Sequence, residues 1–528
     1  MVFDLLSDPL ISVEEKAGGR RRVSLPALLA LLAQDRVLDY PAQRSHQRHA
    51  WHALTVQLAA LALQRAGGGG LPVEAADWTR LLGGLAGEAS ATAWSLAAAS
   101  ERPAFLQAPG GSTETWGRVE TPDALDMLVT SKNHDVKRAR MAGAEPEDWL
   151  FALVTLQTME GFMGAGNYGI ARMNGGYGSR ACVALDHGLG PGWRFAREVR
   201  LLLANRDVWQ QFAPFRRTGG IALVHLLPWD GRTSLSPQDL DPWFVEICRR
   251  VRLEAEGGRL VARTAGSKAA RIAAQASKGS LGDPWVPVEK RKEGAAALSL
   301  SAEGFGYRRM QELLFDRGKW EPAAFQLPVE SDPDDGLAVY ACALARGQGK
   351  TEGFHERRVP LSRKVQRMLT RRATDPIAAA AAERVEAVGR LSGKVLRPAL
   401  FCLHQGGPPG EALKYDDHSS AALARTVLKR FDAWVDEGFF PALWRELEPE
   451  AAAERRTERA AWLQGCAERA LALLREAAAR QPLPGIRRYR AQVRAESLFH
   501  GALHRHLPEL RQPREVTRDE RAEPVAAA

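Results

Sequence analysis

The chain has 528 residues, which is too long for one compact core and predicts about two to four domains. Hydrophobic residues make up 45% and charged residues 26%, a balance typical of a globular protein and not of a disordered chain. Lys and Arg number 72 against 63 for Asp and Glu, so the net charge is +9, which favours an anionic partner without proving one.

The five cysteines are far apart in sequence and form no CxxC pair. This spacing argues against a zinc ribbon or a disulfide framework and suits a reducing cytoplasm. The N-terminus has no basic region followed by a long apolar run, so we expect no signal peptide. No apolar run approaches the roughly 20 residues of a membrane span. We therefore expect a cytoplasmic protein that does not enter a membrane.

The first 360 residues mix short strands with helices. A strand with a turn is expected at 3–12, and a helix at 24–34, where Ser24 is placed to cap the N-terminus and Pro26 lies in the first turn. The other predicted elements of this part are helices at 76–98, 146–160 and 197–213, an extended turn at 102–109, and strands at 220–228 and 336–344.

The helix expected at 46–65 begins with three histidines and ends at the Gly67–Gly70 run. Spacings of three place His46, His49 and His52 roughly on one side of the helix, as a metal site would require. No carboxylate or cysteine is spaced to complete such a site. We therefore predict no metal and a solvated start to this helix.

From about residue 360 the composition shifts to Ala, Leu, Arg and Glu, with apolar residues three and four apart. This pattern is typical of helices with one buried face and predicts an up-down helix bundle. The fold class we predict is α+β: a large mixed α/β domain at 1–360, a four-helix bundle at 361–507 and a disordered polar tail at 508–528. The predicted bundle helices are 361–392, 418–446, 450–480 and 487–507.

One stretch stands out by composition: residues 161–180 hold seven glycines, two tyrosines, two asparagines and two arginines. Glycine lets a backbone approach another molecule, tyrosine offers a stacking face and arginine a fork for phosphates or base edges. One interpretation is a nucleic-acid contact. The other is a glycine-rich connection between strands, and composition does not decide between them.

Two basic stretches accompany it. Residues 131–143 carry four basic residues and His134. Residues 256–292 hold a longer basic run, which two or three short strands would present as a protruding hairpin. A solvated charged face is the alternative for this run.

Two local patterns suggest an enzyme, but neither is complete. The Gly-Gln-Gly-Lys-Thr run at 347–351 follows an apolar strand, yet the first glycine of a phosphate-binding loop is replaced by Leu344 and the helix start that follows is weak. Asn133, His134 and Asp135 resemble a nuclease fragment without metal ligands or a second histidine. A binding protein fits better, with a stand-alone nucleic-acid-dependent ATPase or nuclease as the alternative.

Several short motifs, taken in order and spacing, resemble one family nearly end to end: the large subunit of the type I-E CRISPR surveillance complex, Cascade (the CasA family). The motifs are Phe-Asp-Leu-Leu-Ser-Asp-Pro-Leu-Ile-Ser-Val at 3–13, Arg-Pro-Ala-Phe-Leu-Gln at 102–107, Asn-His-Asp at 133–135, Gly-Phe-Met-Gly-Ala-Gly-Asn at 161–167 and Gly-Gln-Gly-Lys-Thr-Glu-Gly-Phe-His-Glu-Arg-Arg at 347–358.

The resemblance implies a non-catalytic subunit without a cofactor, acting in antiviral defence. Such a subunit reads the protospacer-adjacent motif (PAM) in double-stranded DNA, mainly from the minor groove, and starts duplex opening. The implied partners are the guide-RNA complex, double-stranded target DNA and the helicase–nuclease that degrades the target.

The resemblance also implies positions for the contacts. The glycine loop falls on Gly161, Gly164, Ala165 and Gly166, with Asn167 beside it. The glutamine wedge falls on the tip formed by Gln348, Gly349, Lys350 and Thr351, and the lysine finger on Lys268 or Arg271. The loop that touches the complex backbone and the 5′ end of the guide RNA falls on Lys132, Asn133, His134, Lys137 and Arg138.

Overall fold

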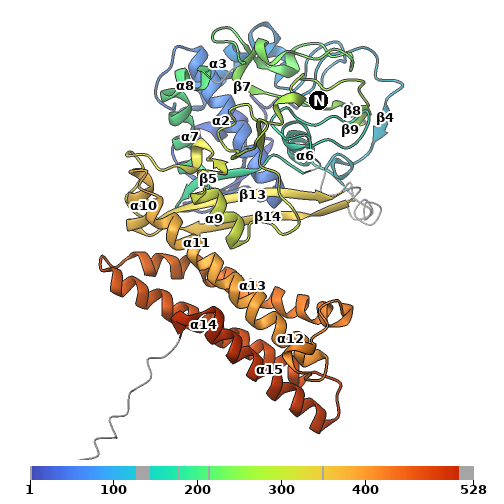
Figure 1. The fold of residues 1–528 in the computed structure, drawn as a ribbon. Helices are drawn as coiled ribbons and strands as arrows, with labels where there is room; N and C mark the ends of the chain where they lie inside the picture. The colour runs from blue at the N-terminus through green and yellow to red at the C-terminus, as the bar shows by residue number, and fades with distance from the viewer. Residues whose placement is uncertain (1–2, 127–142, 177, 212–213, 348–349, 511–528) are drawn as a thin grey trace, which may run out of the picture. The chain divides into compact units, whose positions relative to one another are not determined.

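The structure is a computed structural model that describes residues 3–126, 143–176, 178–211, 214–347 and 350–510. The chain divides into two compact units, Met1–Ala373 and Thr374–Ala528 (Figure 1). The division falls later than the boundary predicted at residue 360, because the helix α10 (Arg363–Thr370) belongs to the first unit. Within that unit, Arg363 pairs with Asp335 at 2.7 Å.

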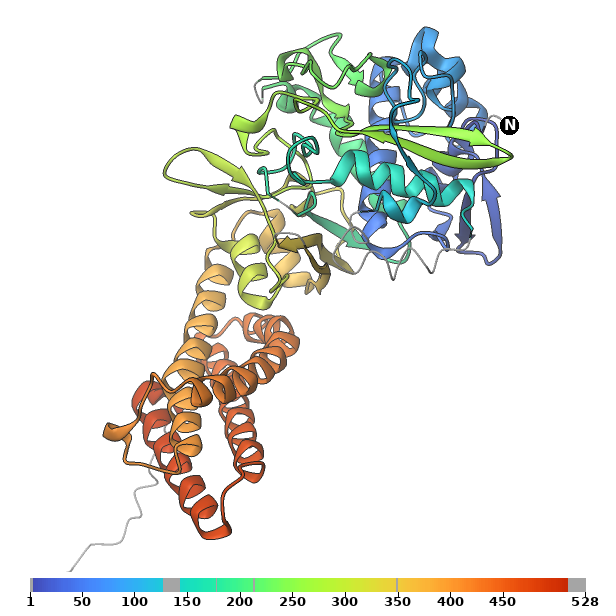
Figure 2. The same ribbon diagram turned by 90° about the vertical axis from the view of Figure 1, so that its right-hand side faces the viewer.

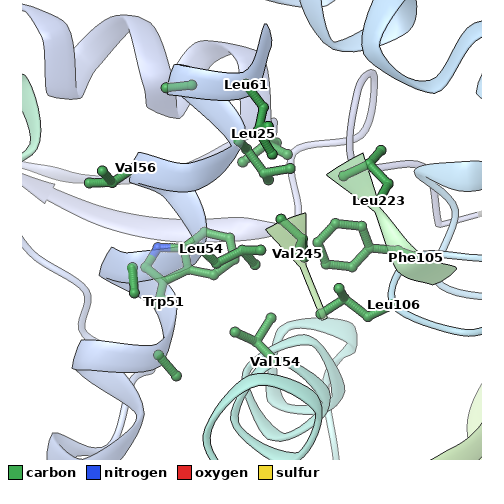
Figure 3. Close-up of a cluster of buried hydrophobic side chains, with 14 of the residues drawn as sticks. Leu25, Trp51, Leu54, Val56, Leu61, Phe105, Leu106, Val154, Leu223 and Val245 are labelled. Carbon is green, nitrogen blue, oxygen red and sulfur yellow. The ribbon is translucent and has the colours of Figure 1, made fainter. Parts of the chain in front are cut away.

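The first unit is built around α2 (Arg48–Arg65), whose residues from His49 to Leu63 are all buried. Trp51 meets Phe151 edge-on, with ring centroids 5.3 Å apart. Leu54 and Val56 lie in the same buried cluster as Trp51 (Figure 3). A helix that is buried on every side is a core helix and not an amphipathic surface helix. Its neighbours are α3 (Ala75–Ala86), α6 (Pro146–Met159), α7 (Gly192–Ala204) and β7 (Leu240–Val245).

The predicted solvated start of this helix is therefore wrong. His46, His49 and His52 are 8%, 5% and 7% exposed. His46 Nε2 lies 2.8 Å from the carboxylate of Asp126, and His52 Nε2 lies 2.7 Å from that of Glu198. Both carboxylates come from distant parts of the chain, so the spacing of residues around the histidines could not predict these pairs. The two ring nitrogens of His49 have no hydrogen-bond partner among the described residues.

Capping signals in the sequence correspond closely to the observed helices. Ser24 caps α1 (Leu25–Ala33) by accepting from the Ala27 N–H, as predicted. The helix α6 begins at Pro146, as predicted, with acidic residues in its first turn. In contrast, α3 ends at Ala86 and does not reach residue 98, because Gly87 adopts a left-handed φ of 57°.

Small sheets surround the core helices, and the longest strands form one hairpin. β13 (Leu337–Gly347) pairs antiparallel with β14 (Lys350–Pro360) on one side and with β5 (Cys182–His187) on the other (Figures 1 and 2). The other sheets are β1 (Ile11–Glu15), β2 (Arg20–Val23) and β3 (Val37–Asp39); β4 (Gly117–Val119), β8 (Arg250–Glu256) and β9 (Arg259–Ala265); β10 (Val288–Lys290), β11 (Ala295–Ala297) and β12 (Trp320–Glu321); and β6 (Ile221–Leu223) with β7.

The second unit is a bundle of four long helical segments, which confirms the predicted α+β fold class. The first segment begins at Asp375, not at 361, because Arg372 adopts a left-handed φ of 56° after α10 and Pro376 then starts a new helix. The segments are α11 (Asp375–Arg390), which continues through the π-helical turn η8 (Leu391–Leu396) into α12 (Arg397–His404), α13 (His418–Leu447), α14 (Ala452–Ala479) and α15 (Gly485–His506). No described helix is long and apolar enough to cross a membrane.

A buried ion pair crosses the bundle. Arg384 on α11 and Glu446 on α13 are each 1% exposed, and Arg384 Nε donates to Glu446 Oε2 at 2.7 Å. Arg384 Nη2 also donates to the carbonyl of Ala442 at 3.0 Å, and its guanidinium lies over the ring of Trp462. Burial lowers the pKa of Arg384 and raises that of Glu446, so each charge depends on the other.

We predict that Glu446→Ala lowers the free energy of unfolding of the bundle by about 3–5 kcal/mol, because it leaves the buried Arg384 guanidinium without its carboxylate, with only the Ala442 carbonyl as acceptor. Arg475→Ala removes the partner of Glu496 at the surface, where the Arg475 side chain is 55% exposed, and should cost at most about 1 kcal/mol. Urea denaturation followed by circular dichroism measures both. If both variants lose the same free energy of unfolding, the buried ion pair contributes no more to stability than the exposed one, which would contradict the prediction.

A second prediction concerns His225, which is 1% exposed and lies beside Phe105 in the first unit. Burial lowers the pKa of His225 from 6.5 to about 4. Below pH 6.5 the unfolded chain therefore binds more protons than the folded chain, and stability is lost as the pH falls from 6.5 towards 4.

His225→Phe keeps a planar ring without the titration. We expect the variant to lose about 2 kcal/mol less unfolding free energy than the unchanged protein between pH 7 and pH 5. All other titratable groups are the same in the two proteins, so their contributions cancel in the difference. Chemical denaturation at the two pH values measures it, and identical pH dependence would show that His225 is not held neutral.

Candidate nucleic-acid interface

The glycine-rich segment that follows α6 folds back on itself. The Gly161 N–H donates to the Gly178 carbonyl, and the Phe162 N–H to the Gly176 carbonyl, both at 3.2 Å. A Cβ atom on Gly161 would lie 2.7 Å from the Gly178 oxygen, and one on Gly169 would lie 2.7 Å from the Gly161 carbonyl carbon. Only glycine permits this packing of backbone on backbone.

The far end of the segment is a tight turn at Gly164–Asn167, which we name the glycine turn. The Asn167 N–H donates to the Gly164 carbonyl at 2.9 Å. Gly166 has a φ of 86° at the third position of the turn, the position that a type II turn reserves for glycine. Ala165 and Asn167 are exposed, and a Cβ on Gly164 would meet no atom within 4 Å. The turn therefore presents its backbone to solvent.

Lys268 lies beside the glycine turn. The Ser267 N–H donates to the Gly166 carbonyl at 3.0 Å, and the Tyr168 hydroxyl donates to the Lys268 carbonyl at 3.2 Å. The Lys268 side chain is exposed. The structure thus brings together two predicted site elements that are about a hundred residues apart in the chain.

Arg271, the other finger candidate, is in the core. It is 3% exposed, and its guanidinium donates to the carbonyls of Leu227 at 3.0 Å and Pro228 at 3.1 Å. It also lies over the ring of Trp229. The buried guanidinium is bonded to the neighbouring loop and does not reach the surface. Arg271 is therefore not part of the candidate interface.

The sequence did not predict a role for Arg249, whose buried guanidinium binds two backbone carbonyls of the glycine-rich segment. Arg249 is 7% exposed. Its Nη2 donates to the Gly161 carbonyl at 2.8 Å, and its Nη1 donates to the Tyr168 carbonyl. The Arg249 N–H donates to Gln157 Oε1 on α6 at 2.8 Å. Nothing in the sequence ties this arginine to a segment eighty residues upstream.

The base of the glycine-rich segment is bonded to the β13–β14 hairpin. The Ser179 N–H donates to the Leu344 carbonyl at 3.1 Å, and the Leu344 N–H donates to Ser179 Oγ at 2.7 Å. Arg346 follows on β13, and its Nε and Nη1 have no hydrogen-bond partner among the described residues. Burial lowers the pKa of Arg346, and the negative charge of Glu160 acts against this by raising it. The hairpin thus brings an incompletely paired cation towards the glycine-rich segment.

The predicted wedge is only partly within the described structure. Lys350 and Thr351 begin the strand β14, where Thr351 pairs with Arg346, whereas a phosphate-binding loop would require a helix at this point. Gln348 and Gly349 lie outside the described residues. So do Lys132, Asn133, His134, Lys137 and Arg138 of the predicted guide-RNA loop.

A pocket of about 370 Å³ adjoins the glycine turn. Phe162, Tyr168, Ile170, Ala270 and Ile272 are among the residues that line it. The rings of Phe162 and Tyr168 lie 6.0 Å apart, tilted by 47°. Apolar walls with aromatic faces are surfaces on which nucleobases stack. The sequence pointed to Tyr168 as a stacking face, but it did not predict the other residues that line this pocket.

Comparisons with known proteins agree with the fold. Thermus thermophilus CasA (Cse1) matches with a TM-score of 0.64 at 17% identity, covering 95% of this chain and 99% of that one. Thermobifida fusca Cse1 matches with a TM-score of 0.65 at 13% identity, covering 96% and 98%. A chain of a CRISPR RNA-guided surveillance complex matches with a TM-score of 0.57 at 16% identity, covering 94% and 99%. At these identities the likeness establishes a shared fold.

No curated protein matches the chain. The family model for CRISPR-associated protein Cse1 matches residues 4–473, which is most of the sequence. This match confirms the resemblance seen in the short motifs, and the chain belongs to the CRISPR-associated Cse1 family.

Proposed function

We propose that this protein is the large subunit of a CRISPR RNA-guided surveillance complex in antiviral defence, and that it reads the PAM in double-stranded target DNA. Family membership and the structural likeness to a chain of such a complex support the first part. The single observation that carries the second part is the exposed glycine turn beside the exposed Lys268.

The chemistry of this pair suits the minor groove. A turn without side chains at Gly164 and Gly166 lets the backbone approach base edges closely, and Asn167 adds an amide that donates and accepts. Lys268 supplies a positive charge for phosphates or groove acceptors. Because the minor groove distinguishes mainly A·T from G·C, readout of this kind tolerates more than one motif.

Duplex opening is proposed for the end of the β13–β14 hairpin, at Gln348, Gly349, Lys350 and Thr351. Separating a base-pair step costs about 1–2 kcal/mol, which insertion beside the PAM offsets for the first step or two. Two features support this role. The hairpin is fastened to the glycine-rich segment through Ser179 and Leu344, and Arg346 places a cation at its base.

The second unit is proposed to bind other subunits and to help hold the displaced strand. On α15, Ile486, Tyr489 and Val493 are 79%, 70% and 48% exposed at spacings of three and four, so they form one stripe. Arg487, Arg488 and Arg490 are exposed between them. Apolar stripes rimmed by charge mark interaction surfaces. The guide-RNA loop at 132–138 and docking of the helicase–nuclease follow from the resemblance alone.

We infer further that the protein is not an enzyme. Among the described residues, Lys350 and Thr351 lie in a strand and not at a helix start, so they lack the geometry of a phosphate-binding loop. The subunit therefore contributes recognition, and chemistry on the target is left to the helicase–nuclease.

The test is a duplex-binding titration with the reconstituted guide-RNA complex, using targets that differ only in the base pairs next to the protospacer. We expect Gly164→Asp and Lys268→Ala to weaken binding by about tenfold or more, or 1.4 kcal/mol, because the first places a carboxylate against DNA and the second removes a cation. Gly68→Asp is the matched control, since Gly68 also has a left-handed φ and open space around its Cβ position.

If the complex without this subunit binds equally well, or if binding ignores the base pairs next to the protospacer, PAM reading is refuted. If Gly68→Asp weakens binding as much as Gly164→Asp, the effect is on folding and not on DNA contact.

A separate prediction concerns α15. The double variant Ile486→Asp, Tyr489→Ala should lower incorporation into the reconstituted complex at least about tenfold, because it removes the centre of the apolar stripe. Size-exclusion chromatography with quantified subunit ratios measures this. Gln464→Asp on α14 is an exposed control, and normal incorporation of the double variant would show that the stripe is not a contact.

A further inference from the structure

Three side chains with metal-binding atoms meet in the core of the first unit: His49 on α2, Cys182 on β5 and Cys342 on β13. One imidazole nitrogen and the two sulfur atoms all lie within 4.8 Å of one another. The three residues are 5%, 0% and 1% exposed. The helix and the two paired strands thus converge on one small volume.

His49 is one of several buried polar side chains of the first unit that lack a hydrogen-bond partner among the described residues, and it is the one that faces two sulfur atoms. Its neighbours in the histidine series are paired, His46 with Asp126 and His52 with Glu198. Both ring nitrogens of His49 are buried and have no hydrogen-bond partner among the described residues. An unpaired buried donor costs about 1–3 kcal/mol, so a ligand for this ring would be strongly stabilising.

The two cysteines are held opposite each other by the strand register, in which Cys182 pairs with Cys342. The Val183 N–H donates to the Trp285 carbonyl at 2.8 Å, on the side away from β13. Because backbone groups alternate along a strand, those of Cys182 face β13, and the two cysteines form a hydrogen-bonded pair with side chains on the same face. This arrangement offers two sulfur ligands from one side.

A positive charge lies beside the cluster. Arg194 Nη2 donates to Cys182 Sγ at 3.8 Å. Two thiolates and a neutral imidazole would balance the charge of a divalent ion.

We propose that His49, Cys182 and Cys342 form a structural zinc site. Nitrogen and thiolate ligands in a buried cluster are the set that zinc prefers. Two sulfur atoms each about 2.3 Å from a tetrahedral zinc lie about 3.8 Å apart, so the cluster needs to contract by at most about 1 Å. An adjoining cavity of about 10 Å³, lined by His49, Cys342 and Glu160, has room for about one water as fourth ligand.

The site joins the central helix to the sheet that carries the β13–β14 hairpin. None of its ligands is exposed, and none belongs to the residues proposed to contact DNA. A site this deep fills while the chain folds, and zinc binding then adds to folding stability. The sequence alone did not predict it, since the three ligands are more than a hundred residues apart.

The test is to produce the full chain in zinc-supplemented medium and measure the bound metal by native mass spectrometry. We expect one zinc ion per unchanged chain and none in Cys342→Ser or His49→Phe. Cys248→Ser is the matched control, because Cys248 is also a buried free cysteine but lies outside the cluster. That variant should keep its zinc.

Chains produced with cobalt in place of zinc give a second readout that needs no variant, since thiolate–cobalt absorption in the near ultraviolet appears only with sulfur ligands. Absence of stoichiometric zinc and of this absorption in the unchanged chain overturns the proposal. So does a Cys182–Cys342 disulfide in chains purified without reductant, or zinc that persists in Cys342→Ser.

Discussion

The candidate interface depends on the packing of glycine backbone against glycine backbone. At Gly161 and Gly169 a single added carbon would overlap main-chain atoms of the same segment. This close approach makes a compact base of the described residues 161–176 and 178. The buried Arg249 binds two carbonyls of the segment and also donates to Gln157 on α6, so it ties the base to that helix. With the base fixed, the glycine turn is held at the surface beside Lys268.

Net charge is a poor guide to where this protein presents positive charge. Many of its arginines are buried and bind carboxylates or backbone carbonyls, so they do not contribute to a basic surface. Arg271 and Arg384 are examples from the two units. The interface proposed for DNA instead rests on few exposed groups, Lys268 and Asn167 among them, set beside a bare backbone. Recognition in this arrangement is a matter of shape and close approach more than of charge density.

Local signals made much of the fold predictable. The cap at Ser24, the proline at the start of α6 and the three- and four-residue spacing of the bundle act within one turn of a helix, and the structure has these elements. The glycine-rich segment stands out by composition and Lys268 follows from the resemblance, whereas the sequence did not predict that the two are adjacent. What the sequence could not supply were partners across long separations: Asp126 for His46, Arg249 for Gly161, and the carbonyls that retain Arg271.

The central claim is that the glycine turn touches DNA next to the protospacer. The most direct measurement replaces Ala165, exposed in that turn, with a photo-crosslinking amino acid in the reconstituted guide-RNA complex bound to target duplex. The same replacement at Ala91, exposed on the short helix α4 (Ser90–Ala93), is the control. We predict crosslinks from position 165 to the base pairs beside the protospacer and none from position 91. Crosslinks from position 165 only to RNA or protein would contradict the account.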